Sequence, residues 1–179
     1  YRENRDYTAE QLLVVAGREC YTHAMRWQLI TVGKPRHNGL AAAGTDYLSR
    51  LRHYIRLEEA VVREERGGKG VSASEIMQRE GERILAHVKP GCNLVVLDRK
   101  GKTLTSESLA ERLQQIAESA SDTAFVIGGA WGLSPEVLKR SDWIWTLSTL
   151  TYPHELARVM VLEQLYRAQT ILRGEPYHK

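Results

Sequence analysis

Short apolar runs alternate with amphipathic stretches along the chain, and this alternation restricts the fold more than any other feature of the sequence. The run at residues 94–97 is continuous, as in a strand that is buried on both faces of a parallel sheet. Further strands are expected at residues 27–32, 55–62, 125–127 and 143–147. With helices between them, these strands predict an α/β protein.

Helical periodicity and capping signals fill the intervals between these strands. Ser72 and Glu75 have the spacing of a capping box, which predicts a helix that runs to about Val88. Ser134 followed by Pro135 is a favourable helix start, because the serine can cap the first turn and proline loses no needed donor there. Further helices are expected at residues 39–51, around 109–116 and from about 153 to 172.

The composition excludes several classes of protein. A net charge of only +3 means that any affinity for nucleic acid must come from local patches. Cys20 and Cys92 lie far apart, which argues against a disulfide framework, and no metal-ligand cluster is evident. The apolar runs are too short to span a membrane and no secretion signal is evident, so we expect a cytoplasmic protein.

The start of the chain differs from the remainder. The sequence begins without methionine, and Met25 directly precedes the first predicted strand. We therefore expect residues 1–24 to be an N-terminal extension, either upstream sequence or an addition for expression. Residues 25–179 are expected to form a single domain.

Ligands collect at the carboxyl ends of parallel strands, where loops converge and backbone groups remain available. The predicted strand ends at Asp98, at Gly128 with Gly129 and at residues 147–154 are therefore candidate binding segments. The glycine pair permits close approach of a ligand, although a tight turn explains it at least as well. It matches neither the dinucleotide fingerprint nor the P-loop. Asp98 could accept a hydrogen bond from a ligand or simply form a turn.

The last predicted helix and the chain end carry further candidates. His154 and Arg158 are four residues apart, so they share a helix face and could line one polar cleft; a solvated face is the alternative. Apolar residues occur on more than one face of this helix, which predicts contact with a second subunit. Tyr177 and His178 are residue types that RNA sites use, or they belong to a frayed polar tail.

Taken together and in order, these motifs resemble the ribosomal large-subunit methyltransferase H family of the SPOUT superfamily. The motifs are Trp27-Gln28-Leu29-Ile30-Thr31-Val32-Gly33, Leu97-Asp98 with Gly101-Lys102, Phe125-Val126-Ile127-Gly128-Gly129, residues 147–154, and the segments 163–168 and 177–179. The likeness covers residues 25–179.

This resemblance implies a SPOUT-type sheet with helices on both faces and a C-terminal deep trefoil knot, in a protein that works as a homodimer. It also implies that S-adenosylmethionine binds in the knot, largely through backbone groups. The residues implied around this cofactor are Leu97, Gly128, Leu147, Ser148, Thr149, Leu150, Thr151 and Tyr152.

The family's reaction implies methyl transfer to N3 of a pseudouridine in a 23S rRNA hairpin, on the assembled ribosome and without a metal. The proton on N3 must leave before or during attack on the methyl group, so a base or a stabilised imidate is needed. The candidates for this catalysis are His154 or His178 for proton transfer, Arg158 for anion stabilisation or RNA contact, and Tyr177 for stacking. The alternatives are a SPOUT enzyme for another rRNA or tRNA nucleotide and a catalytically silent ribosome-binding module.

Overall fold

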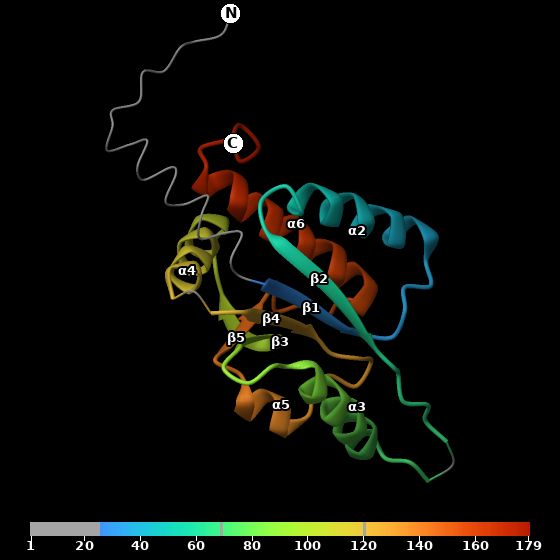
Figure 1. Cartoon of the computed structure of the whole chain (residues 1–179). Coiled ribbons are helices and arrows are strands. Elements are labelled where there is room, and N and C mark those ends of the chain that lie inside the picture. The colour runs from blue at the N-terminus through green and yellow to red at the C-terminus, as the bar shows by residue number, and fades with distance from the viewer. Residues whose placement is uncertain (1–25, 69, 120) are drawn as a thin grey trace, which may run out of the picture.

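The computed structural model describes residues 26–68, 70–119 and 121–179, and it contains a parallel five-stranded sheet (Figure 1). The strands are β1 (Arg26–Val32), β2 (Arg56–Val62), β3 (Asn93–Thr103), β4 (Thr123–Ile127) and β5 (Trp143–Thr146). Their order is β2-β1-β4-β3-β5, and every pairing is parallel. The predicted α/β class is confirmed. The extension expected at residues 1–24 lies outside the described residues.

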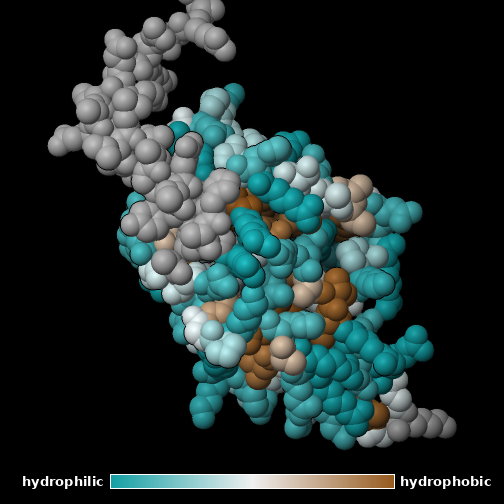
Figure 2. Space-filling view, in the orientation of Figure 1, coloured by the Kyte–Doolittle hydropathy of each residue, from teal (hydrophilic) through white to brown (hydrophobic). Residues whose placement is uncertain are grey.

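Helices cover both faces of this sheet (Figure 1). Helices α2 (Asn38–Leu51), α4 (Ser106–Glu118) and α6 (His154–Leu172) share one face, with α6 packed against both of the others. Helices α3 (Ala73–His87) and α5 (Pro135–Arg140) share the other face. On the face seen in Figure 2 most of the surface is hydrophilic, and apolar residues reach it only at separate places.

Alternating strand residues supply the two cores. Leu29 and Phe125 pack in the core beneath α6, whereas their neighbours Ile30 and Val126 pack in the core beneath α3 and α5. Successive side chains of a strand point to opposite faces, so a continuous apolar run is what a sheet covered on both sides requires.

The helix starts follow the predicted caps. Ser72 accepts a hydrogen bond from the Glu75 amide while the Glu75 carboxylate accepts one from the Ser72 amide, so the capping box is confirmed. Ser134 accepts a hydrogen bond from the Val137 amide at 3.3 Å, with Pro135 in the first turn of α5. Each cap satisfies backbone donors that the first turn would otherwise leave unpaired.

The prediction that β3 ends at Asp98 is wrong, because this strand continues to Thr103. Its pairing with β5 shifts between Leu97 and Lys102, and Lys102 and Thr103 then pair with Trp145 and Thr146. Gly101 makes this second pairing possible: a Cβ atom there would lie 2.7 Å from the carbonyl oxygen of Ile144. Asp98 therefore belongs to a bulge within the strand.

Candidate active site

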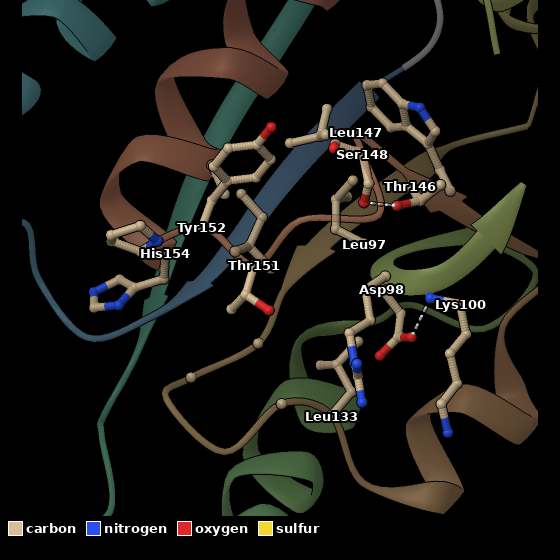
Figure 3. A pocket seen from close by; sticks show the side chains of 18 of the residues that line it. Leu97, Asp98, Lys100, Leu133, Thr146, Leu147, Ser148, Thr151, Tyr152 and His154 are labelled. Atoms are coloured by element: carbon tan, nitrogen blue, oxygen red, sulfur yellow. Dashed lines mark hydrogen bonds between the residues drawn. The ribbon is translucent and has the colours of Figure 1, made fainter. Parts of the chain in front are cut away.

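A cavity of about 750 Å³ opens beside the bulge of β3 and the carboxyl ends of β4 and β5 (Figure 3). Its volume lies within the usual range for small-molecule and cofactor sites. Three segments line most of it: residues 97–100 on β3, the turn at residues 128–132 after β4, and the loop at residues 147–152 after β5. The structure thus brings the three predicted strand-end segments together.

Most of the residues predicted at the cofactor site line this cavity. They are Leu97, Gly128, Leu147, Ser148, Leu150, Thr151 and Tyr152. Thr149 belongs to the same loop but is not among the lining residues. Leu97, Leu147 and Tyr152 provide apolar surface and the glycines provide bare backbone, a combination that suits a ligand with an aromatic ring and polar groups.

The turn at residues 128–132 is closed by its own backbone. The amide of Gly132 donates a hydrogen bond to the carbonyl oxygen of Gly129 at 3.1 Å, and Gly132 has a φ of +91°. A Cβ atom on Gly128 would lie 3.0 Å from backbone atoms of Gly132. The tight-turn interpretation of the glycine pair is therefore supported, and at Gly128 the absent side chain makes room for the turn itself.

Hydrogen bonds also fix the shape of the loop at residues 147–152. The Thr146 hydroxyl donates to the carbonyl oxygen of Ser148 at 2.6 Å, and the Leu150 amide donates to the Ser148 hydroxyl at 3.1 Å. The Leu150 side chain is left 66% exposed at the rim of the cavity.

The lining of the cavity also includes an exposed aromatic ring and cations. Trp131 is 59% exposed, and Arg99 and Lys100 are exposed beside the cavity. Asp98 accepts a hydrogen bond from the Lys100 amide at 2.8 Å, which supports its interpretation as a turn former. The sequence interpretation did not select Trp131; its position between glycines at a strand end was the available signal.

His154, the first residue of α6, lines the cavity as predicted (Figure 3). Its Nε2 atom lies near the loop after β1, 3.8 Å from the point that a Cβ atom on Gly33 would occupy. The next residue, Glu155, accepts hydrogen bonds from the amides of Arg36 and His37, both at 2.9 Å. These bonds lower the pKa of the Glu155 carboxyl group, the His37 amide having the largest effect. They join the start of α6 to the start of α2.

Arg158 is not brought into the cavity. It is 7% exposed and forms a bidentate ion pair with Glu59 on β2, with N···O distances of 2.7 and 2.8 Å. Its third nitrogen, Nη1, packs against Gly44 of α2 without a hydrogen-bond partner among the described residues. In this arrangement Arg158 joins α6, β2 and α2 in the interior.

Tyr177 and His178 pack against residues 163–167 in the second half of α6, away from His154. The Tyr177 hydroxyl group donates to Glu163 at 3.1 Å, and His178 contacts Glu107 at 2.8 Å. Burial raises the pKa of Tyr177, and its hydrogen bond with Tyr47 adds to this. The chain end is thus packed and is not a frayed tail. Since a helix rises about 1.5 Å per residue, about 20 Å of α6 separate His154 from Arg167, which stacks on Tyr177.

Two negative findings apply to the described residues alone. No group of three or more His, Cys, Asp or Glu side chains there could hold a metal ion. No helix in the same part of the chain is both long and apolar enough to cross a membrane.

Comparison with known proteins identifies the family. A family model described as a predicted SPOUT methyltransferase matches residues 25–178. The ribosomal RNA large subunit methyltransferase H of Gemmatimonas aurantiaca is 47% identical over 155 residues, which are 87% of this chain and 100% of that protein. The protein of the same name from Alkaliphilus oremlandii is 40% identical over 159 residues, with the same coverage of both chains. The chain belongs to the ribosomal large-subunit methyltransferase H family.

Solved structures support the fold of this methyltransferase family member. A probable methyltransferase from Bordetella pertussis Tohama I aligns with a TM-score of 0.54 and 12% identity, over 86% of this chain and 99% of that one. A probable methylase family protein from Haemophilus influenzae aligns with a TM-score of 0.50 and 16% identity, over 88% of this chain and 71% of that one. At such low identities the likeness concerns the fold alone.

Proposed function

We propose that this protein uses S-adenosylmethionine to methylate N3 of a pseudouridine in the 23S rRNA of the assembled ribosome, in the cytoplasm. The observation that carries this proposal is the similarity, over 87% of this chain, to the whole length of proteins named ribosomal RNA large subunit methyltransferase H, at 47% and 40% identity. The position of the cavity adds to it, because ligands of open α/β sheets bind where strands reach their carboxyl ends.

The residues around the cavity fit the cofactor. When bound, S-adenosylmethionine supplies a methyl group on a positively charged sulfur. The turn at residues 128–132 and the loop at residues 147–152 present backbone groups for its polar parts. Leu97, Leu147 and Tyr152 provide the apolar contacts that an adenine ring needs. A C-terminal trefoil knot around these loops is part of the proposal.

His154 is the proposed proton acceptor within a single protomer. Its side chain lines the cavity. Among the described residues, none forms a hydrogen bond with its imidazole ring, so both ring nitrogens are available. A neutral imidazole there could take the N3 proton as the nucleophile approaches the methyl group. Enclosing the reactants between the two loops would also hold them in line and exclude competing water.

The rim of the cavity suits an RNA nucleotide. Trp131 and Leu150 offer exposed apolar surface on which a base can stack, and Arg99 and Lys100 offer charges for phosphate groups. Since the net charge of the chain is only +3, this local patch has more weight than the charge of the whole molecule.

We also propose that the enzyme is a homodimer in which the chain end serves the partner's cavity. Leu156, Val159 and Met160 leave a half-buried apolar stripe on α6 that a second subunit could cover. Tyr177 and His178 do not line the cavity of their own protomer: the Tyr177 hydroxyl is bonded to Glu163, about 14 Å along α6 from His154, so the proposal brings them to the cavity of the partner.

Incubation with S-adenosylmethionine labelled in its methyl group and with ribosomes that lack the modification tests the activity. We expect label in the large-subunit rRNA, and mass mapping should place it on a pseudouridine at N3. Label on another rRNA or tRNA nucleotide would show that the protein is a methyltransferase with a different substrate. Ribosome binding without any methyl transfer would instead identify a catalytically silent module.

A further inference from the structure

Glu80 of α3 is a buried carboxyl group with half of its hydrogen bonding unmet. The residue is 2% exposed, and its Oε1 atom accepts a hydrogen bond from the Glu65 amide at 2.9 Å. Its Oε2 atom is buried and finds no hydrogen-bond partner among the described residues. An ionised carboxylate in such a place would be costly, whereas a neutral acid avoids most of that cost.

This unpaired oxygen lies directly beneath the turn at residues 128–132. A Cβ atom on Gly129 would lie 2.6 Å from Oε2 of Glu80 and 3.1 Å from the side chain of Val32. Gly129 itself lines the cavity and accepts the hydrogen bond from Gly132 that closes the turn. Glu80 is therefore packed against the far side of a residue whose near side faces the cavity.

The second contact of Glu80 joins this turn to the segment that follows β2. Glu65, whose amide donates to Glu80, is held on α3 by ion pairs with Arg79 at 3.0 Å and with Arg83. The carboxyl group of Glu80 thus bridges two chain segments that meet beneath the cavity.

We propose that Glu80 is a positioning residue for cofactor binding, and that it supports the turn at residues 128–132 as a neutral carboxylic acid. This inference rests on the proposed binding of S-adenosylmethionine at that turn. When Glu80 ionises, an unpaired charge appears beneath Gly129, and the turn must move or admit water to solvate it.

The surroundings of Glu80 shift its carboxyl group towards the protonated form. Burial raises the pKa of its carboxyl group, and Glu64 and Glu65 add to this through repulsion. The hydrogen bond from the Glu65 amide and the charge of Arg83 act in the opposite direction, with less effect than burial. The turn itself has no titratable side chain, and Val32 of β1, which also lies beside Gly129, is apolar.

Calorimetry with S-adenosylhomocysteine between about pH 5 and about pH 9 tests the proposal in the full-length protein, across the range in which buried glutamates titrate. We expect the affinity of the wild type to fall about tenfold as the pH rises, equal to about one pKa unit of coupling.

Glu80→Gln should keep the low-pH affinity throughout, because an amide stays neutral and its oxygen still accepts the hydrogen bond from the Glu65 amide. Glu80→Leu should bind about tenfold more weakly at every pH, because it leaves that amide unpaired. Glu82→Gln, an exposed change on the same helix, should follow the wild type.

Thermal unfolding without ligand gives a second reading. The wild type should lose stability relative to Glu80→Gln as the pH rises from about 4.3, the ordinary glutamate pKa, up to the raised pKa of the folded protein. The inference is overturned if Glu80→Gln shows the same pH dependence of affinity as the wild type, or binds as weakly as Glu80→Leu. A wild type that binds no S-adenosylhomocysteine at any pH would instead refute the proposed cofactor, and the role of Glu80 with it.

Discussion

Gly132 shows at the scale of one residue how backbone conformation shapes the cavity. Its φ of +91° is a conformation that side-chain-bearing residues rarely adopt, although the space around it is open. The hydrogen bond from its amide to Gly129 closes the turn that lines the cavity. Strain at this residue should therefore affect both stability and ligand binding.

Gly132→Ala is expected to lower the free energy of unfolding by about 1 to 2 kcal/mol and to weaken S-adenosylhomocysteine binding, since alanine resists this φ. Gly91→Ala is a matched control: Gly91 has a φ of +74° in equally open space but does not line the cavity. It should show a similar loss of stability in denaturant titrations and unchanged affinity in calorimetry. An equal loss of affinity in both variants would contradict this account.

Arg158 illustrates why spacing alone cannot assign a role. Its four-residue separation from His154 predicted a shared helix face and one polar cleft. Both residues lie on α6, but only His154 lines the cavity, because the Arg158 guanidinium group pairs with Glu59 of β2. We expect Arg158→Ala to lower the free energy of unfolding by about 1 to 2 kcal/mol, because it removes the hydrogen-bonded ion pair with Glu59 and the packing of the buried guanidinium group, while water can reach the partly exposed Glu59 carboxylate.

The double variant Glu59→Leu/Arg158→Met separates structure from chemistry. It removes both charges together, so much of the lost stability should return, and methyl transfer per folded molecule should stay near the wild-type rate. Chemical denaturation and single-turnover assays measure the two quantities. A double variant that folds well but transfers no methyl groups would contradict this account and support a role of Arg158 in anion stabilisation or RNA contact.

Helices and strands differ in how far the sequence determines their limits. The cap of α3 was predictable because Ser72 and Glu75 are neighbours in the chain and satisfy each other. The length of β3 was not, because its last residues are held by pairing with β5, which comes much later in the sequence. Glu80 falls at the spacing of the buried Ile76 and Ile84, which is a sequence signal for an unusual charge, but nothing local places Gly129 opposite it.

Glu155 offers a prediction about how α6 is attached to α2. Hydrogen bonds from the His37 and Arg36 amides lower the pKa of its carboxyl group, so the ionised form stabilises the fold. We expect Glu155→Ala to lower the unfolding temperature at pH 7. The difference from the wild type should shrink as the pH falls below about 4.3, the ordinary glutamate pKa, and vanish below the lowered pKa of the folded protein.

Thermal scans from neutral to acidic pH measure this difference. Glu111→Ala, an exposed change on α4, is the control and should match the wild type at each pH. A difference between Glu155→Ala and the wild type that persists unchanged in acid would show that Glu155 acts through packing instead of through its charge.

At the scale of the whole molecule, the sequence predicted the three segments that line the cavity, although it misplaced the end of β3. It did not predict that His154 alone of the catalytic candidates would lie there. The strand ends follow from the alternating pattern, because parallel strands place their carboxyl ends on one edge of the sheet. The chain end could not be placed in this way. Its position depends on contacts with Tyr47 of α2, Glu107 of α4 and Glu163 of α6, which no local pattern encodes.

The separation of His154 from Tyr177 makes the proposed dimer testable by complementation. In a protein that works across an interface, each active site combines His154 of one protomer with Tyr177 of the other. A purified heterodimer of a His154→Ala chain and a Tyr177→Phe chain then contains one site with both residues intact. It should recover about half of the wild-type methyl transfer, although each variant homodimer has lost most of it.

The reciprocal heterodimer distinguishes this arrangement from a site within one protomer. When both substitutions lie in one chain and the partner is wild type, a site across the interface is damaged on both sides, whereas a site within one protomer survives intact in the wild-type chain. We therefore expect this second heterodimer to be nearly inactive in the labelled-methyl assay. The opposite pattern, with activity only in the second heterodimer, would place Tyr177 at the cavity of its own chain and require the chain end to leave Glu163 and swing along α6.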